Sequence, residues 1–382
     1  MGYTRGKILK RAPLEYLSEL IETQAQGEAA IQSMIAKSME QSGCAVEFYD
    51  YFPNQVPVKG EFSTGEPNNG QKRRVLIATA KGDPTLPSLL IFAHPDSETV
   101  KNVEKWNSDP FAAISNNGKL FGWGVADDLA GCACAVEAIK VTLDRKKVAL
   151  GDIIFASTPS KNYARGVASI LHRGLTADAS LYLHPAESGK GMGEIKAVAS
   201  GQLEFSISVI GLAPDTTEPG HTAFSHLGVN PIDKAIKIID ALYQLNAARN
   251  LRIKHEKIHK EVGRSTNLHI SNIVSNDEHR LSRLNETCTF GGAISFPPGE
   301  DLSQVKEEIE KTVKKVSEND DWLNANSPTI SWVSGVTGAE VPESSLFYQI
   351  VSSATKSITG KMPYVNPMHT SSDIRNPIVE AN

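Results

Sequence analysis

The 382-residue sequence predicts an α/β fold: a doubly wound, mostly parallel sheet with an inserted α+β domain. Strand and helix patterns alternate along the first half of the chain, as in parallel α/β sheets. The continuously apolar segment 89–93 is typical of a strand buried on both faces. Near residue 200 the pattern changes to that of a half-exposed sheet, and a chain of this length exceeds one ordinary core. Two domains are therefore expected.

The first half of the chain supplies the predicted parallel sheet. Apolar residues recur at helical spacing over 14–42, which predicts one N-terminal helix. Further strands and helices follow in alternation. Strands are predicted at 74–79, 88–93, 152–156 and 179–183, with helices at 131–143 and 163–171.

From residue 200 the pattern indicates a smaller sheet with one wet face. Residues 201–211 alternate apolar and polar side chains. A helix at 231–245, strands at 267–274 and 287–296, and a charged helix at 301–318 complete the insertion. We expect residues 200–320 to form a lid domain inserted into a domain made of 1–199 and 321–382. Residues 329–333 are expected to return the chain to the first sheet, before a helix at 344–359.

Composition excludes several classes of function. The net charge is −5 and the basic residues are scattered, which argues against a nucleic-acid partner. No apolar run reaches the length of a membrane span, and the basic segment 1–12 lacks the apolar part of a secretory signal. The four cysteines form no Cys-x-x-Cys pair, so we expect a reducing, cytoplasmic location.

Three candidate metal ligands follow strands or turns. His94 follows the strand at 89–93, Asp127 follows a Gly-Trp-Gly turn, and His184 follows the strand at 179–183. Ligands of open parallel sheets bind outside the carboxyl ends of the strands. Each residue alone is more often a core histidine or a helix cap. Together they predict one divalent transition metal, zinc or manganese.

Two motifs resemble the metallopeptidase family of acetylornithine deacetylase, succinyl-diaminopimelate desuccinylase, aminoacylase and glutamate carboxypeptidase. They are LIFAHPDS at 90–97 and GWGVADD at 122–128. The resemblance extends over essentially the whole chain, lid included. It implies that His94 binds metal, that Asp96 hydrogen-bonds the other nitrogen of His94, and that Asp127 is the carboxylate that bridges two metals in relatives. His184, before Pro185, stands where relatives carry an acidic ligand.

The departures from the family pattern alter the expected site. Relatives carry a Glu-Glu pair whose first member is the general base and whose second binds metal. Here Ser160 and Lys161 stand at those positions, so Lys161 is expected to place a positive charge where a second metal would sit. Relatives also carry a histidine beyond a Ser-Asp motif. Ser372-Asp373 matches the motif, but the sequence ends at Asn382 without that histidine, so we expect a truncated or missing tail.

Because Ser160 stands at the position of the usual general base, the residue that acts as the base in this chain is open. Glu187 is the nearest acidic candidate on the loop after His184, with Asp128 and Glu98 as alternatives; equally, Glu187 is expected to cap the following turn. Candidate substrate contacts come from several segments of the chain and include a residue next to the Ser-Asp motif. They are His369, Arg264, Asn267 and Ser160, with Arg283 as an alternative anion contact.

The motif Gly220-His221-Thr222-Ala223 resembles the lid of the same family, where the histidine crosses a dimer interface to contact the oxyanion in the neighbouring site. The resemblance therefore implies a catalytic role for His221 in trans and a homodimer or higher homo-oligomer through the lid. Strand 203–209 is expected to be an exposed edge available for that pairing.

The resulting functional prediction is a single-metal hydrolase of a C–N bond in a small anionic substrate. The lost Glu-Glu pair favours hydrolytic deamination of an activated aminobenzoate, as in the 5-nitroanthranilate aminohydrolases, because an electron-poor ring needs less proton transfer to its leaving group. Amide hydrolysis, as in family deacylases and dipeptidases, is the first alternative. A degenerate member that binds a ligand without catalysis is the second.

Overall fold

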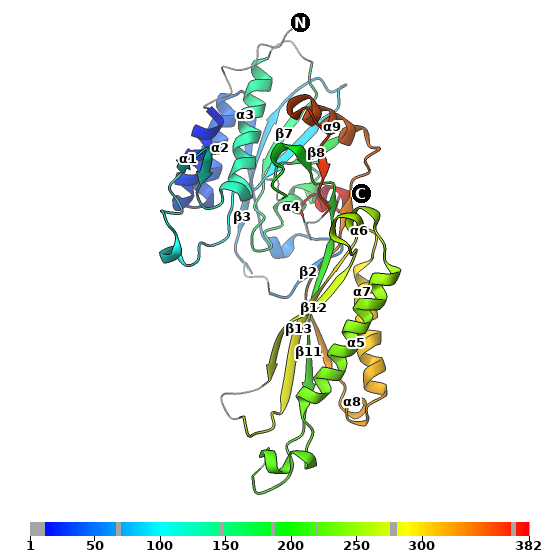
Figure 1. Ribbon diagram of the computed structural model, residues 1–382. Helices are drawn as coiled ribbons and strands as arrows, with labels where there is room; N and C mark the ends of the chain where they lie inside the picture. Colours follow the sequence, from blue (N-terminus) through cyan, green and yellow to red (C-terminus); the bar gives the residue numbers. More distant parts are fainter. Residues whose placement is uncertain are drawn as a thin grey trace.

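The computed structural model describes residues 12–65, 70–145, 149–184, 188–218, 220–275, 281–367 and 372–381. The described chain forms a broad unit of sheet and helices joined to an elongated second unit (Figure 1). The C-terminal helix α10 (Arg375–Val379) lies at the junction of the two units (Figure 1).

The larger unit is built on a five-stranded sheet with the order β1-β3-β7-β4-β8. Strands β4 and β7 are parallel, as are β4 and β8, whereas β3 is antiparallel to both of its neighbours. Four of the five strands therefore run in the same direction, which confirms the predicted mostly parallel α/β sheet. The strands are β1 (Ala45–Tyr51), β3 (Arg73–Ala80), β7 (Ile153–Ser157), β4 (Leu89–Ala93) and β8 (Ala179–Tyr182).

Helices cover both faces of this sheet. On one face, α1 (Ala12–Thr23), α2 (Glu28–Gln41) and α3 (Ala130–Asp144) pack on the strands in one apolar cluster. On the other face, α4 (Gly166–His172) packs on the strands in a second cluster. The single helix expected over 14–42 is wrong: Gly27, with φ 93°, separates α1 from α2 because a left-handed residue cannot continue a helix.

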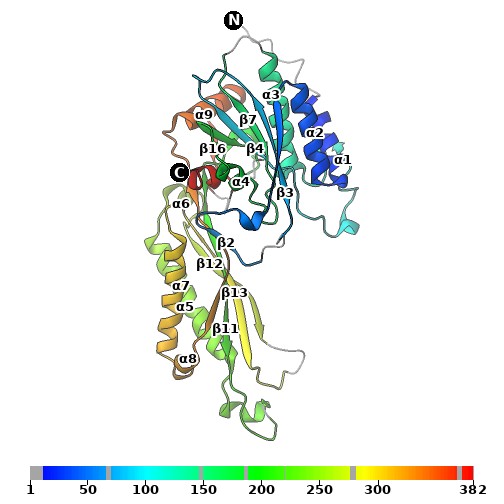
Figure 2. The same ribbon diagram turned by 180° about the vertical axis from the view of Figure 1, so that it is seen from behind.

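The second unit, the lid, is a five-stranded antiparallel sheet with the order β12-β13-β11-β14-β2. Helices α5 (Pro231–Arg252) and α7 (Leu302–Glu318) lie side by side along one face of it (Figures 1 and 2) and share its apolar core. Its strands are β12 (Asn267–Ser275), β13 (Thr287–Phe296), β11 (Gly201–Ile210), β14 (Thr329–Val336) and β2 (Glu61–Ser63).

Two expectations about the lid are wrong. The segment expected to return to the first sheet is β14, which pairs instead with β11 and β2 in the lid sheet. Strand β11, expected at an edge, is central because β13 and β14 pair along both of its sides. The edge strand next to β13 is β12, where Ile273 and Val274 are exposed.

Short elements connect the two units and close the fold. Strand β10 (Val198–Ala199) pairs with β15 (Ala339–Glu340) where the chain enters and leaves the lid. The remaining elements are β5 (Ile114–Asn116), β6 (Lys119–Phe121), β9 (Glu194–Ile195), β16 (Tyr364–Val365), α6 (Glu256–Val262), α8 (Asp321–Ala325) and α9 (Leu346–Thr359).

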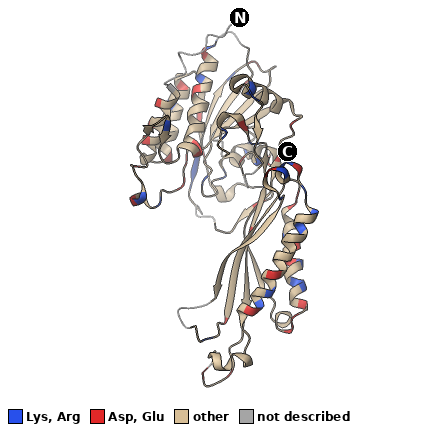
Figure 3. Cartoon of the chain, in the orientation of Figure 1, with Lys and Arg blue, Asp and Glu red and all other residues tan. Residues whose placement is uncertain are grey.

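The charged residues lie mainly on the outer helices, while the strands of both sheets are largely uncharged (Figure 3). Both charge signs occur together on α5 and α7, as on solvated helix faces. Among the described helices, none has the length and apolar character that crossing a bilayer would require.

Candidate active site

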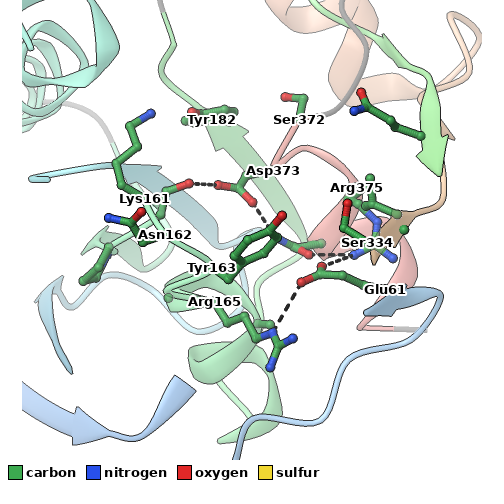
Figure 4. Close-up of a pocket in the computed structure, with 18 of the residues that line it drawn as sticks. Glu61, Lys161, Asn162, Tyr163, Arg165, Tyr182, Ser334, Ser372, Asp373 and Arg375 are labelled. Carbon is green, nitrogen blue, oxygen red and sulfur yellow. Dashed lines mark hydrogen bonds and ion pairs between the residues drawn. The ribbon is translucent and has the colours of Figure 1, made fainter. Parts of the chain in front are cut away.

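A cavity of about 500 Å³ lies where the lid meets the larger unit. Asp127, Lys161 and His184 line it from the larger unit, and Glu204 and Ser334 line it from the lid sheet. The close-up in Figure 4 shows Glu61 and Ser334 facing Lys161 and Asp373 across the same space. The cavity thus adjoins the ends of β4, β7 and β8, where ligands of open α/β sheets bind.

His94 is fully buried directly after β4. Its Nδ1 lies 2.6 Å from the carbonyl oxygen of Thr158, so this nitrogen carries a proton and donates. Its Nε2 lies 2.9 Å from Oδ2 of Asp373. Burial lowers the pKa of His94, but the Asp373 carboxylate, with Asp128 and Asp96, outweighs burial and raises the pKa to about 9.

Asp96 does not hold His94, which corrects the expectation from the family pattern. Its carboxylate accepts hydrogen bonds from the backbone nitrogens of Ser160 and Lys161, at 2.9 and 2.8 Å. It also forms an ion pair with Arg73 at 2.9 Å. The carbonyl of Thr158 already occupies Nδ1 of His94. Asp96 therefore fixes the loop that carries Ser160 and Lys161.

That loop has an unusual backbone. Asn162, Tyr163 and Arg165 have φ values of 55°, 56° and 54°, in the left-handed region that non-glycine residues seldom adopt. The helix expected to begin at residue 163 consequently begins at Gly166. A Cβ on Gly166 would lie 2.4 Å from the carbonyl oxygen of Pro159, so only glycine fits this close approach. Strained residues of this kind cluster at functional sites.

Lys161 and His184 lie on opposite sides of the Asp127 carboxylate. The Nζ of Lys161 is 2.5 Å from Oδ2 of Asp127. The Nε2 of His184 is 3.7 Å from Oδ1 of the same residue. The ammonium group therefore contacts one oxygen of Asp127 directly, which leaves no place for a second cation at that oxygen.

The metal donors predicted from the sequence come together only in part. His94 pairs with Asp373 and His184 pairs with Asp127, and both imidazoles lie beside the ring of Tyr182, at centroid distances of 4.9 and 5.1 Å. Within the described residues, no group of three or more His, Cys, Asp or Glu side chains is close enough to hold an ion as it stands.

The chemistry of these donors nevertheless fits one divalent ion. Oδ1 of Asp127 is a buried oxygen without a hydrogen bond, and Nε2 of His94 is a buried nitrogen that faces the carboxylate of Asp373. Imidazole nitrogen and carboxylate oxygen are ligands that zinc accepts. Lys161, by contrast, places an ammonium group next to Asp127, and an ammonium group has no lone pair to donate to a metal.

A serine-hydrolase arrangement is excluded at this site. Asp373 accepts a hydrogen bond from Oγ of Ser160 at 2.7 Å and faces His94. The carboxylate therefore stands between hydroxyl and imidazole, whereas an activated serine needs the imidazole in the middle. Burial raises the pKa of Asp373, but the contacts with His94, Ser160 and Lys161 lower it to about 2, so this carboxylate is too weak a base to take the proton of Ser160.

Sequence reasoning missed an ion cluster that joins the two units. Glu61 on β2 lies 3.3 Å from Nε of Arg165 and 3.3 Å from Nη1 of Arg375 (Figure 4). Arg375 is buried and also donates to the hydroxyl of Thr337 at 3.2 Å. One feature of the sequence could have pointed to this cluster, namely that Arg375 follows the Ser372-Asp373 motif.

The candidates for the general base differ in their position relative to the cavity. Glu98 lines the cavity. Asp128 is buried and accepts a hydrogen bond from the backbone nitrogen of His94 at 3.0 Å; burial raises the pKa of Asp128 to about 8 although His94 lowers it. Glu187 lies outside the described residues.

Several predicted residues lie away from the cavity of their own chain. The Nδ1 of His221 accepts from the backbone of Ala223 at 3.1 Å and caps a short helix at the distal end of the lid (Figure 1). Arg264 and Asn267 are exposed and contact each other at 3.3 Å, and neither lines the cavity. His369 lies outside the described residues.

Comparison with known proteins gives a family match over most of the chain. The model of peptidase family M20/M25/M40 matches residues 90–377. N-formyl-4-amino-5-aminomethyl-2-methylpyrimidine deformylase of Bacillus subtilis (strain 168) is 27% identical over 312 residues, which is 81% of this chain and 67% of the relative. Succinyl-diaminopimelate desuccinylase of Legionella pneumophila (strain Corby) is 29% identical over 189 residues, 47% of this chain and 48% of the relative.

Solved structures share the fold at low sequence identity. Aminopeptidase PepT from Bacillus cereus has a TM-score of 0.65 at 16% identity, covering 97% of this chain and 87% of that one. Human carnosine dipeptidase 1 has a TM-score of 0.64 at 14% identity, with the same two coverages. A dinuclear metal-binding peptidase from Bacillus subtilis has a TM-score of 0.59 at 13% identity, covering 95% of this chain and 84% of that one.

Proposed function

Because this chain belongs to peptidase family M20/M25/M40, and so is a metal-dependent hydrolase of C–N bonds, we propose that it cleaves the amide bond of a small N-acyl amine with one metal ion. The observation that carries the proposal is that Asp127 and His184 line one cavity, while His94, directly after β4, faces Asp373 in the lining of the same cavity. This location is where α/β enzymes bind their ligands.

The metal in this proposal is a single zinc or manganese ion held by His94, Asp127 and His184. Such an ion, when bound, supplies Lewis-acid chemistry to the scissile carbonyl. Lys161 supports the count of one, because its ammonium group contacts Asp127 where a second ion would need the carboxylate. Ser160 and Lys161 are fixed by Asp96 through their backbone nitrogens and so form a rigid wall of the site.

The chain must also move protons, since an amine is a poor leaving group. Two residues are the candidates for the base. Glu98 lines the cavity, and Glu187 lies three residues after His184 in the sequence. Substituting each by glutamine separates them: the base is the residue whose loss reduces kcat by about 100-fold or more, as expected for general acid–base catalysis.

Relatives support amide cleavage over deamination. The deformylase and the desuccinylase are both named for removing an acyl group from an amine. A second candidate remains hydrolytic deamination of an activated aminobenzoate such as 5-nitroanthranilate. It is favoured by Ser160 and Lys161, because neither is a carboxyl group that could take a proton from water and pass it to the departing amine of an amide.

The released product discriminates the two reactions. The purified protein is treated with a chelator, reloaded with zinc or manganese, and incubated with N-formyl amines, N-succinyl amino acids and 5-nitroanthranilate. Amide hydrolysis is expected to release formate or succinate in a metal-dependent manner, and the Asp127→Asn variant is the inactive control. Release of ammonia from 5-nitroanthranilate without amide cleavage would contradict the proposal. No turnover of any substrate, with ligand binding intact, would indicate a degenerate binding protein.

We further propose that residues 1–199 and 321–382, apart from β2 and β14, act as the catalytic domain and that residues 200–320, with β2 and β14, act as the lid. The lid is proposed to form a homodimer in which His221 reaches the partner's site. The distal position of His221 supports this, because in its own chain it does not line the cavity. A cytoplasmic location remains a prediction. The cysteines are free thiols in the described structure, and Cys44, Cys132 and Cys288 are buried.

A further inference from the structure

The charged side chains that line the cavity are not balanced. Five are carboxylates: Glu61, Glu98, Asp127, Glu204 and Asp373. Three are lysine or arginine side chains: Lys161, Arg165 and Arg375. The divalent ion proposed to bind at Asp127 would offset this excess of two, so the preference of the cavity depends on which carboxylate lacks a cationic partner.

The cationic side chains are already engaged by carboxylates of the same site. Lys161 contacts Asp127, and Arg165 and Arg375 both contact Glu61. The positive charge of Lys161 suggested an anionic substrate. Such a substrate would have to compete with Asp127 for the ammonium group of Lys161.

Among the described residues that line the cavity, Glu204 and Glu98 are the carboxylates without a cationic partner, and Glu98 is already a candidate for the base. Glu204 lies on the central strand β11 of the lid sheet, half-buried at the cavity wall. Its Oε1 accepts from Nε2 of Gln202 at 2.9 Å, and its Oε2 accepts from Oγ of Ser334 at 3.0 Å. Both donors are neutral, and within the described residues no lysine, arginine or histidine is ion-paired to Glu204.

These contacts orient Glu204 without neutralising it. A strand paired on both sides fixes its backbone, and one hydrogen bond to each oxygen fixes its carboxylate. Each carboxylate oxygen still has acceptor capacity for a donor in the cavity. A pre-oriented, half-buried anion binds a charged nitrogen more strongly than a neutral one.

We infer that the substrate carries a positively charged nitrogen, as an ammonium or amidinium group, and that Glu204 of the lid binds it. The inference rests on the proposed function, since it names the part of the N-acyl amine that lies away from the scissile bond. Gln202 and Ser334 are positioning residues that hold the carboxylate.

Binding of three simple probes tests the inference independently of turnover. Benzamidine, benzyl alcohol and benzoate present a cation, a neutral group and an anion on the same ring, and calorimetry measures their affinities. Benzamidine is expected to bind at least about tenfold more tightly than benzoate. The Glu204→Gln variant is expected to lose about tenfold in benzamidine affinity, as for removal of a charged hydrogen bond, with benzyl alcohol unchanged.

A matched control separates the local effect from a change in net charge. Glu310→Gln alters an exposed residue of α7 by the same charge and is expected to leave all three affinities unchanged. Thermal unfolding of both variants establishes that they are folded. Tighter binding of benzoate than benzamidine, or equal benzamidine affinity in the Glu204→Gln and Glu310→Gln variants, overturns the inference.

A substrate pair distinguishes failure of the inference from failure of the proposed function. N-formyl-1,4-diaminobutane and N-formylpentylamine differ in a terminal charge. A higher kcat/KM for the charged amide, reduced by Glu204→Gln through KM, supports both statements. Cleavage of both amides with equal kcat/KM overturns the inference alone. A benzamidine preference without cleavage of either amide overturns the proposed function alone.

Discussion

Lys161 and Asp127 form the contact that defines the chemistry of this site. The ammonium group lies 2.5 Å from one carboxylate oxygen, while His184 lies on the side of the other. Lys161 thus holds a positive charge directly beside the carboxylate of Asp127. We therefore predict one metal ion per chain, measured by plasma mass spectrometry after dialysis against zinc or manganese.

The same measurement on two variants checks the ligands. His184→Ala is expected to lower metal content to a small fraction of one, because only two protein ligands remain. His172→Ala, which changes an imidazole on α4 outside the cavity, is the control and is expected to retain the ion. Two tightly held ions in the unmodified chain would contradict the role given to Lys161.

Replacing Lys161 by methionine keeps bulk and removes charge. Asp127 then loses its cationic partner, so the site becomes more negative and the acidic limb of the kcat profile is expected to move upward by roughly one pH unit. Metal content is also expected to rise, because the carboxylate becomes available to a second ion. An unchanged pH profile in Lys161→Met, combined with loss of turnover in Glu98→Gln or Glu187→Gln, would contradict this. It would show that a side-chain base alone determines the pH at which kcat falls on the acidic side.

At the scale of elements, the loop before α4 determines the wall of the site. It combines three left-handed residues with a close approach of backbone at Gly166. Gly166→Ala would place a Cβ 2.4 Å from backbone and is expected to destabilise the protein by roughly 2 kcal/mol, with loss of activity. Gly193→Ala, at a position with open space, is the control. Equal unfolding temperatures for the two variants would contradict the argument.

Asp320 connects two helices of the lid, α8 and α5. It caps α8, and accepts from Lys234 and Lys237 of α5 at distances of 2.8 and 2.7 Å. Burial raises the pKa of Asp320, but the hydrogen bonds from Lys234 and Lys237 outweigh burial and hold the pKa well below its usual range. A carboxylate with a depressed folded pKa stabilises the fold above its unfolded pKa and loses this contribution as the pH falls.

Asp320→Asn is therefore expected to lower the free energy of unfolding by roughly 2 kcal/mol at pH 7. The difference from the unmodified protein should shrink as the pH falls below about 4, where the carboxylate of the unfolded chain is protonated. Urea unfolding at several pH values measures it. A difference that stays constant down to pH 3 would mean that Asp320 acts only as a helix cap.

At the scale of the whole molecule, the lid holds His221 far from the cavity of its own chain. Strand β12 is the lid edge on the side away from β2 and exposes apolar side chains, and β11 is not the edge expected from the sequence. In the proposed homodimer, each His221 acts in the partner's cavity.

Mixing two inactive variants tests this arrangement. Asp127→Ala lacks a metal ligand and His221→Ala lacks the contributed histidine, so a mixed dimer has one site with both residues intact. Up to about half of the activity of an unmodified dimer is expected in each mixed dimer. Activity that stays at zero while light scattering and tagged pull-down show mixed dimers would contradict a role in trans.

Local sequence patterns were sufficient for β4, α3 and α7, because burial imposes a periodicity that can be read over a few residues. They also placed His94 and His184 after neighbouring strands. The break at Gly27 and the late start of α4 were missed, because positive φ values at a few residues leave the apolar pattern unchanged.

Only the tertiary structure decided which strands share a sheet and which charges meet. β2 and β14 pair far apart in sequence, and Glu61 meets Arg165 and Arg375 across separations of 104 and 314 residues. The residue types at 94, 127 and 184 are a local property of the chain, and so were visible in the sequence. The partner of each charge depends on how two sheets pack together, and no spacing along the chain encodes that packing.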